Sequence, residues 1–246
     1  MPIVSLTLIS FVAWFLSTLS GGGSPFILIP VINLILGAAA VPPVITTGML
    51  LGNLQRVLML WRDINWKLTF WYLPGGITGS VLGAYTFTHI HLAWLQVLIG
   101  LFLLSNIFTF GFGKKERTFK VAEWYFLPAG FFKSFISGLI GSSGPILNPF
   151  YLNYGLVKEQ LLATKSLHMA SIHVVKIIAY AAFGAFTPEY LGYGLIIGLA
   201  AIPANLLGKQ ILGHMNPVHF RQLVLWSMAI GGGFMLWQER AFLSFW

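Results

Sequence analysis

The chain contains no cysteine, so disulfide bonds, thiolate metal sites and cysteine nucleophiles are excluded. Charge is scarce as well. Only 8% of the 246 residues are Asp, Glu, Lys or Arg, whereas a soluble domain carries about 25%. No nucleotide-binding or phosphate-cradling motif occurs, which argues against an ATP-driven pump built from this chain alone. Zinc-binding patterns are also absent, and we expect neither a metal nor another cofactor.

Acidic residues are the rarest charged type, with 6 acids against 14 bases and a formal net charge of +8. All the acids lie at the ends of expected segments or in loops, so the sequence offers no pair of carboxylates for hydrolytic chemistry inside a membrane. We therefore expect that the protein is not an enzyme. An excess of basic residues is typical of the cytoplasmic loops of a membrane protein, and no nucleic-acid partner is expected.

Apolar residues fill the chain instead, at 57% of the sequence. Runs near 20 residues can cross about 30 Å of hydrocarbon. The expected helical segments are 3–20, 24–36, 43–60, 66–88, 92–112, 121–140, 145–155, 160–184, 190–212 and 217–238. The first segment lacks a basic leader and a clear cleavage site, so we expect it to be part of the fold. The sequence thus predicts an all-α polytopic membrane protein.

Two of these segments, 24–36 and 145–155, are too short to cross a bilayer easily, since thirteen helical residues reach only about 20 Å. Each follows a break rich in glycine or serine: GGGSPFILIP at 21–30 and GSSGPILNPF at 141–150. Glycine permits the backbone dihedrals of a sharp reversal. Each break is therefore expected to form the tip of a re-entrant helical hairpin or a broken helix.

The residues after each reversal have the chemistry of a helix start. We expect Ser24 to be the N-cap of the first short helix, with Pro25 at its first helical position. Ser142 or Ser143, followed by Pro145, is expected to do the same in the second break. Free backbone N–H groups and the positive end of the helix dipole would make each start an anion site. The alternative is that the breaks only allow close packing of helices.

The breaks lie in two weakly similar halves, 1–112 and 121–246, joined by a basic linker at 113–120 that we expect in the cytoplasm. The loop at 61–67 is basic, whereas the corresponding loop at 184–190 has one acid and no base. This swap predicts two inverted repeats, each a broken hairpin followed by three membrane-spanning helices. Inverted repeats are common in secondary transporters, whose substrates bind near the midplane at discontinuous helices.

Both break sequences, together with DINWKLTFWYLPGGITGSVLGAY at 63–85, resemble the TauE/SafE sulfite exporter family. The resemblance covers essentially the whole chain. It implies a multi-pass protein of the bacterial cytoplasmic membrane that moves sulfite, sulfonates or related small anions, mostly outward. The second break departs from the family, because it has serines where many members have more glycine.

Candidate substrate-binding residues lie at the breaks and on the helices that follow them. Charges inside a membrane are costly and usually functional, which draws attention to Lys165 and Lys176; snorkelling to the interfaces is the alternative for both. His168 is nominated as a proton carrier, against an alternative role as a core hydrogen-bonding group. The full set is Gly22, Gly23, Ser24, Asn53, Ser142, Ser143, Gly144, Asn148, Lys165, His168 and Ser171.

Arg56 lies near the cytoplasmic end of its segment and is expected to snorkel to the interface. The expected partners are a small anion of the sulfite or sulfonate class and the lipid bilayer. A homodimer is compatible with the sequence, which offers no specific support for one. The alternative function is a non-transporting membrane subunit or assembly factor, which would not need two symmetric polar breaks.

Overall fold

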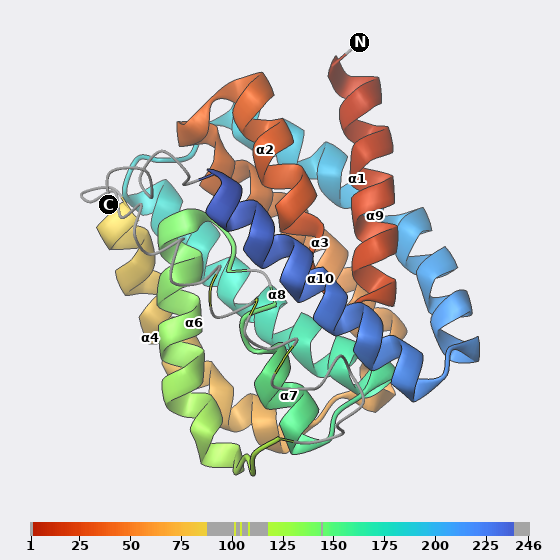
Figure 1. The fold of residues 1–246 in the computed structure, drawn as a ribbon. Coiled ribbons are helices and arrows are strands. Elements are labelled where there is room, and N and C mark those ends of the chain that lie inside the picture. The colour runs from red at the N-terminus through yellow and green to blue at the C-terminus, as the bar shows by residue number, and fades with distance from the viewer. Residues whose placement is uncertain are drawn as a thin grey trace.

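The structure is a computed structural model that describes residues 2–87, 101, 104, 108, 118–143 and 145–238. These residues form helices and connecting turns, with no strand among them. The helices are α1 (Pro2–Leu19), α2 (Ser24–Leu36), α3 (Val41–Met59), α4 (Trp66–Phe87), α6 (Phe126–Ile140), α7 (Asn148–Tyr154), α8 (Lys158–Ala182), α9 (Pro188–His214) and α10 (Pro217–Gln238) (Figure 1). Short 3-10 turns follow or precede them at η1 (Ala38–Ala40), η2 (Trp61–Asp63) and η3 (Glu123–Tyr125).

The predicted segments agree closely with these helices. α2 and α10 have the predicted bounds, and most other ends differ by one or two residues. α6 begins five residues later than predicted, because η3 occupies the start of that segment. The predicted segment 92–112 lies outside the described residues except for positions 101, 104 and 108, which are helical.

The outside of the bundle is apolar and its inside holds polar groups. Large apolar side chains such as Leu58, Phe70 and Ile178 are exposed to 78%, 71% and 64%. α8 and α9 are long and apolar enough to cross a membrane, and α1 is a shorter apolar helix. In lipid, an apolar surface costs nothing, whereas polar side chains must find partners inside the protein. The distribution of side chains therefore fits a bilayer environment.

One group of helices runs in a common direction. Gly48 of α3 contacts Ile197 of α9. About three turns further along each helix, Lys209 of α9 donates a hydrogen bond to the carbonyl of Met59 of α3. α3 and α9 are therefore parallel. α1 packs along α9 in the same group, where Thr18 meets Asn205.

A second group consists of α4, α6 and α8. The α4–α6 contact is built on three glycines spaced one helical turn apart: Gly75, Gly79 and Gly83 face the backbone carbonyls of Leu127, Phe131 and Phe135. Without a Cβ on α4, the two backbones approach closely, as in other small-residue interfaces within membranes. The order of these contacts makes α4 and α6 parallel. α8 also runs along α4, from the Thr69–His168 contact onward.

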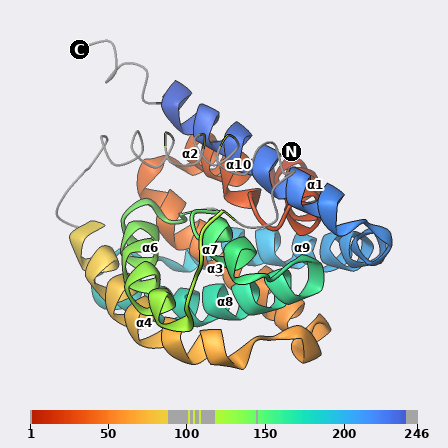
Figure 2. The same cartoon turned by 60° about the horizontal axis from the view of Figure 1, so that its bottom comes forward.

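The two groups run in opposite directions, because η2 turns the chain back between α3 and α4. α3 and α8 meet in the centre of the molecule, with α1 and α9 on one side and α4 and α6 on the other (Figure 1). α10 lies along one face of this assembly, close to α1 and α2 (Figure 2). The two breaks are thus enclosed by helices from both groups.

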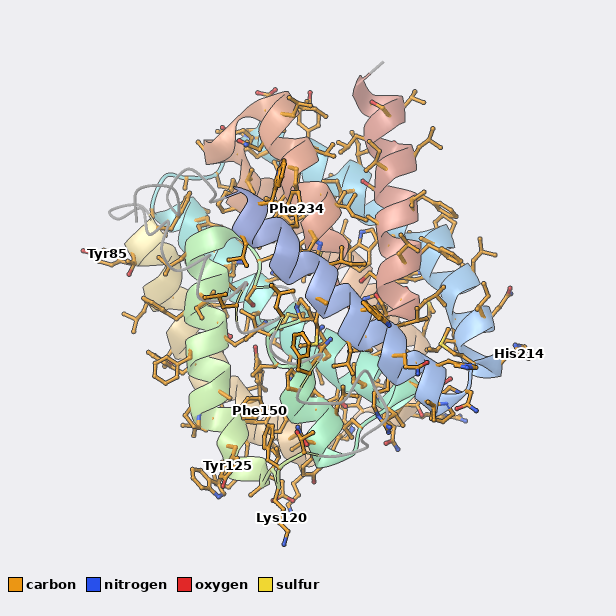
Figure 3. The ribbon with its side chains drawn as sticks, in the orientation of Figure 1. Tyr85, Lys120, Tyr125, Phe150, His214 and Phe234 are labelled. Carbon is orange, nitrogen blue, oxygen red and sulfur yellow. The ribbon has the colours of Figure 1, made fainter. Side chains whose placement is uncertain are left out.

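Several helix ends and turns meet at one end of the molecule, where Lys120, Tyr125 and Phe150 also lie (Figure 3). Lys67 forms a salt bridge of 2.8 Å with Glu123, and Tyr154 donates a hydrogen bond to the same carboxylate. The hydrogen bond from Lys67 holds the pKa of the Glu123 carboxyl below its ordinary value. These contacts tie the start of α4 to η3 and to the end of α7.

The first break reverses the chain through three consecutive glycines. Gly21, Gly22 and Gly23 have φ values of +66°, +132° and +122°, which L side chains rarely adopt. The N–H of Gly22 donates to the carbonyl of Ser17, which ends α1. The sequence therefore needs glycine at all three positions to turn α1 into α2.

The predicted cap of α2 is wrong. Gly23 occupies the N-cap position and Ser24 lies in the first turn, where its hydroxyl donates to the sulfur of Met49 and accepts from no backbone N–H of the helix. An N-cap residue normally has β-region dihedrals. Because the chain arrives with positive φ at Gly23, the helix begins one residue earlier than the Ser-Pro pattern predicts.

The predicted caps at Ser142 and Ser143 are wrong for a different reason. Residues 145–147 form a turn, closed by a hydrogen bond from the N–H of Asn148 to the carbonyl of Pro145. α7 begins only at Asn148, with Pro149 in its first turn, and has 7 residues. A helix of two turns presents a much weaker dipole than the predicted arm. Of the two expected helix starts, only the start of α2 therefore offers a strong positive dipole end.

Candidate functional site

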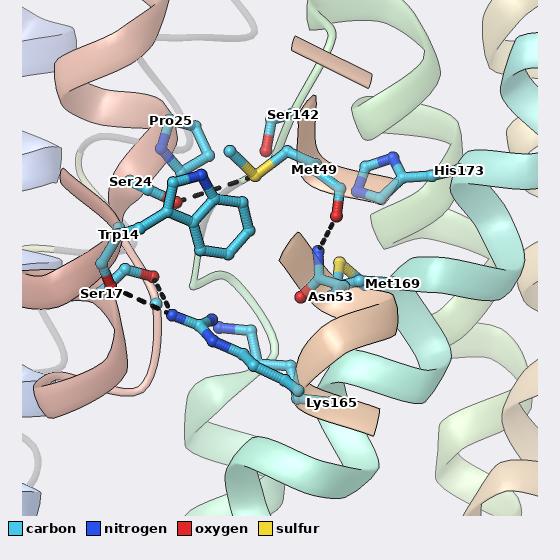
Figure 4. Close-up of a pocket in the computed structure, with 13 residues that line it drawn as sticks. Trp14, Ser17, Ser24, Pro25, Met49, Asn53, Ser142, Lys165, Met169 and His173 are labelled. Carbon is cyan, nitrogen blue, oxygen red and sulfur yellow. Dashed lines mark hydrogen bonds between the residues drawn. The ribbon is translucent and has the colours of Figure 1, made fainter. Parts of the chain in front are cut away.

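A small cavity lies between the first break, α3 and α8. The volume of the cavity is about 30 Å³, which exceeds the 10–15 Å³ or so that one buried water needs. Its lining residues are Trp14, Ser17, Gly22, Gly23, Ser24, Pro25, Met49, Asn53, Arg56, Ser142, Lys165, Met169 and His173. Figure 4 shows Ser24 and Pro25 on one side of the cavity and Asn53, Met169 and His173 on the other.

Six predicted site residues line this cavity together: Gly22, Gly23, Ser24, Asn53, Ser142 and Lys165. They come from two breaks and two helices that are far apart in sequence. The start of α2 opens into the cavity, where the N–H of Ser24 has no intrahelical partner. Pro25 has no N–H, and the N–H of Phe26 donates to the carbonyl of Gly23. The cavity therefore combines the positive end of a helix dipole with side chains from the centre of the fold.

Arg56 is the best-held cation of the site. Its Nε donates to Asn205 at 3.0 Å, and its Nη2 donates to the hydroxyl of Thr18 at 2.7 Å. The same Nη2 reaches the hydroxyl of Ser17, and the guanidinium lies over the ring of Trp14, 4.7 Å from its centroid. Arg56 is only 4% exposed. The expected snorkelling of Arg56 is wrong, because partners from α1 and α9 hold it inside the bundle.

Lys165 joins the two breaks. Its Nζ donates to the carbonyl of Gly21 in the first break and to the side-chain oxygen of Asn148 at the start of α7, both at 2.7 Å. Asn148 also donates to Gly21 at 3.4 Å. An ammonium group has three N–H donors, so one donor of Lys165 remains for a ligand. The ammonium also lies directly against Gly22, where a Cβ would overlap Nζ of Lys165.

Two further lining groups have no hydrogen-bond partner among the described residues. They are the indole Nε1 of Trp14 and the imidazole Nδ1 of His173. Both side chains are buried, at 0% and 1% exposure. Buried polar atoms are almost always paired in folded proteins, so two unpaired atoms on one cavity make it a candidate binding site.

Cations gather in this region without a counter-ion. Arg56, Lys133, Lys165 and Lys176 are all buried, at 9% exposure or less. The acids in the described part of the chain, Asp63, Glu123, Glu159 and Glu189, all lie in turns or first helical turns and none is buried. Buried charges in proteins are normally paired. Four basic side chains are thus buried here with no acidic side chain beside them among the described residues.

The other two buried lysines are held outside the lining. Lys176 donates to the carbonyl of Gly141 and to the hydroxyl of Ser137, so it binds the second break as Lys165 binds the first. Lys133 lies against the sulfur of Met169 and donates to Tyr72 at 3.5 Å. Neither Lys165 nor Lys176 snorkels, because each donates to a carbonyl group that the end of α1 or of α6 leaves free.

His168 lies away from the cavity. Its Nδ1 pairs with the hydroxyl of Tyr151 at 2.8 Å and its Nε2 with the hydroxyl of Thr69 at 3.1 Å. Its ring stacks on Tyr72, with the centroids 4.0 Å apart. With both nitrogens paired inside a cage of rings, His168 fits the alternative role of a core hydrogen-bonding group.

Three other predicted residues, Ser143, Asn148 and Ser171, do not line the cavity. Ser171 donates to the carbonyl of Leu167 on its own helix, and the hydroxyl of Ser143 is buried without a partner among the described residues. Asn148 acts through Lys165. Gly144 lies outside the described residues.

Sequence reasoning missed several residues that line the cavity, namely Trp14, Met49, Met169 and His173. It also did not place Arg56 at the cavity. The sequence carries no signal for Trp14, since tryptophan is common throughout such chains. His173 shares a helical face with His168 and Lys165. Which histidine lines the cavity depends on how α8 is rotated relative to the first break. The sequence alone does not determine this rotation.

Comparisons with known proteins give a consistent result. The family described as "Sulfite exporter TauE/SafE" matches residues 6–235. A protein of Methanocaldococcus jannaschii, described as a "Probable membrane transporter protein", is 24% identical over 269 residues, covering 94% of each chain. No solved structure matches.

Proposed function

Since the chain belongs to the TauE/SafE sulfite exporter family and is thus a membrane transporter, we propose that it exports sulfite or a small organosulfonate as a secondary transporter. One observation carries this proposal: four buried cations surround or adjoin the cavity, and the described structure places no carboxylate beside them. A small anion supplies the charge that the protein lacks. A cation in the same place would meet only repulsion.

The donors around the cavity suit an oxyanion. Nη1 of Arg56 and Nε1 of Trp14 have no hydrogen-bond partner among the described residues, and Lys165 has a third N–H. The N-terminus of α2 adds the backbone N–H of Ser24 and the positive end of the helix dipole. Charge-assisted hydrogen bonds of this kind contribute about 1.5–3 kcal/mol each. Several such bonds offset the cost of stripping water from a small anion.

Two inverted repeats account for the arrangement of the helices. α1, α3 and α4 of the first repeat correspond to α6, α8 and α9 of the second. Each corresponding pair runs in opposite directions, and the contacts exchange: α1 and α3 pack on α9, as α6 and α8 pack on α4. This pattern supports a pseudo-two-fold axis in the membrane plane, the architecture of many secondary transporters. The cavity between the breaks then lies near the midplane.

Export needs no nucleotide in this scheme. An interior-negative membrane potential drives each negative charge outward with about 2.3 kcal/mol per 100 mV. Purified protein in proteoliposomes tests the function. We expect it to accelerate the exchange of radiolabelled sulfite, and unlabelled methanesulfonate should compete.

The selectivity of that exchange is decisive. Dimethyl sulfone has nearly the shape of methanesulfonate without its charge, and we expect no competition from it. Trimethylammonium should not compete either. Flux of sulfite no faster than in empty liposomes would favour a non-transporting subunit, and equal competition by the neutral sulfone would refute the anion site.

A further inference from the structure

His173 is a buried histidine whose position the proposed function leaves unexplained. Its ring points from α8 toward Met49 and Asn53 in the cavity (Figure 4). It is 1% exposed, and its Nδ1 makes no hydrogen bond to any described residue. A histidine that served only packing would be expected to pair this nitrogen, as His168 does on the same helix. The unpaired Nδ1 is therefore available for a proton.

The ionisable side chains around His173 in the described structure are all basic. Lys165 and Arg56 line the same cavity. Lys176 lies three residues further along α8, and Lys133 of α6 contacts Met169, another lining residue. None of the acids in the described ranges lies in this region, because all of them occupy turns or first helical turns. An imidazolium in the empty cavity would add a fifth positive charge to this group. A bound anion supplies the compensating negative charge.

We propose that His173 takes up a proton at Nδ1 when an anion binds, so that the transporter carries a proton and an anion together. The proton comes from water on the side where the anion enters, and it forms the Nδ1–H bond. It returns to water on the other side when the anion leaves. This inference rests on the proposed anion transport, and it adds a co-transported ion to it. The proton cancels one negative charge per cycle, so the membrane potential then acts only on the net charge of the anion and the proton together.

The electrostatics favours joint binding over exchange. Each ligand raises the affinity for the other by the same factor, because linkage is reciprocal. A proton that competed with the anion would have to weaken anion binding, whereas protonation of any group that lines the cavity makes the cavity more positive and strengthens it. His173 thus replaces His168 as the residue for the proton, since His168 has both ring nitrogens paired away from the cavity.

Calorimetry of anion binding measures this proton directly. The probe is methanesulfonate, whose charge is constant across the neutral range, so any proton taken up belongs to the protein. The heats measured in bis-Tris and in Tris, two buffers that are not oxyanions, differ by the number of protons taken up multiplied by the difference between the ionisation enthalpies of the two buffers. We expect the wild-type protein to take up protons as methanesulfonate binds, approaching one proton per anion at the pH of maximum uptake.

His173→Gln should still bind methanesulfonate, more weakly, and should take up no proton. His214→Gln is the matched control, because His214 lies exposed at the end of α9 and points away from the bundle (Figure 3); its uptake should equal that of the wild type. His173→Asn serves if the glutamine variant does not elute as a folded monodisperse protein.

The outcomes separate the two proposals. Binding to the wild type without proton uptake overturns the role of His173 and leaves anion transport standing. Equal proton uptake in the His173 variants also overturns it. If the wild type does not bind methanesulfonate, sulfite or taurine at all, the proposed function itself fails.

Discussion

At the scale of single residues, Arg56 is the side chain on which the site depends most. Its guanidinium connects α1, α3 and α9 through Trp14, Thr18 and Asn205. These contacts fix the direction of Nη1, the nitrogen left for a ligand. A planar fork can bind partners on several sides at once, which an ammonium group cannot do in the same place.

We therefore expect Arg56→Lys to weaken sulfite binding although the charge is kept. Loss of one charge-assisted hydrogen bond, about 1.5–3 kcal/mol, corresponds to a rise in Kd of roughly 10- to 100-fold. Arg62→Lys is the control, since Arg62 is exposed in η2, and its Kd should not change. Calorimetry gives both values. Wild-type affinity in Arg56→Lys would show that charge alone, without the guanidinium geometry, holds the anion.

At the scale of elements, the tip of the first hairpin combines two demands on its glycines. Gly22 needs positive φ, and it also lies under the ammonium group of Lys165. Gly37, at the end of α2, has a φ of +82°, and a Cβ added there would meet no atom within 4 Å. Substitutions at Gly22 and at Gly37 therefore separate the effect of backbone strain from the effect of crowding in the site.

Both Gly22→Ala and Gly37→Ala should lower the unfolding temperature, because a Cβ strains positive φ by about 1–2 kcal/mol. Only Gly22→Ala should also raise the Kd for sulfite, since its methyl group displaces Lys165 from Gly21 and Asn148. Thermal unfolding and calorimetry on the two variants give the comparison. If both variants bound sulfite like the wild type, the tip would be only a packing device.

The elements show what the sequence could and could not predict. Hydrophobic runs gave the helices within a few residues, because the bilayer imposes their length and polarity. The three glycines of the first break were correctly read as a reversal. The helix starts were not, because one residue of positive φ moves the cap from Ser24 to Gly23, and a turn at 145–147 shortens α7.

The site was partly predictable for a similar reason. Polar residues inside apolar segments are few, so Asn53 and Lys165 could be found by inspection, and both line the cavity. Trp14, Arg56 and His173 could not be assigned, because their roles depend on how α1, α3 and α8 are rotated against each other. The periodicity of apolar residues shows which face of a helix is buried, but it does not show which other helix packs against that face.

At the scale of the whole molecule, the inverted repeats make a topological prediction. The turn at η2 and the turn before α9 occupy corresponding places in the two repeats, so they should lie on opposite sides of the membrane. The chain has no cysteine of its own, so Arg62→Cys and Glu189→Cys give single labelling sites. We expect an impermeant maleimide to reach Glu189→Cys from outside the cell and Arg62→Cys only from the cytoplasm. Labelling of both from one side would contradict the inverted arrangement.

The central claim is that the cavity beside the first break is the anion site. Selenite is a close chemical analogue of sulfite, and its selenium can be located by anomalous X-ray scattering in crystals of the protein. We predict one strong peak in the cavity, with oxygens at hydrogen-bond distance, about 2.7–3.2 Å, from Arg56, Lys165 or Nε1 of Trp14. A peak at another place, such as beside Lys176 and the second break, or none at saturating selenite, would contradict the claim.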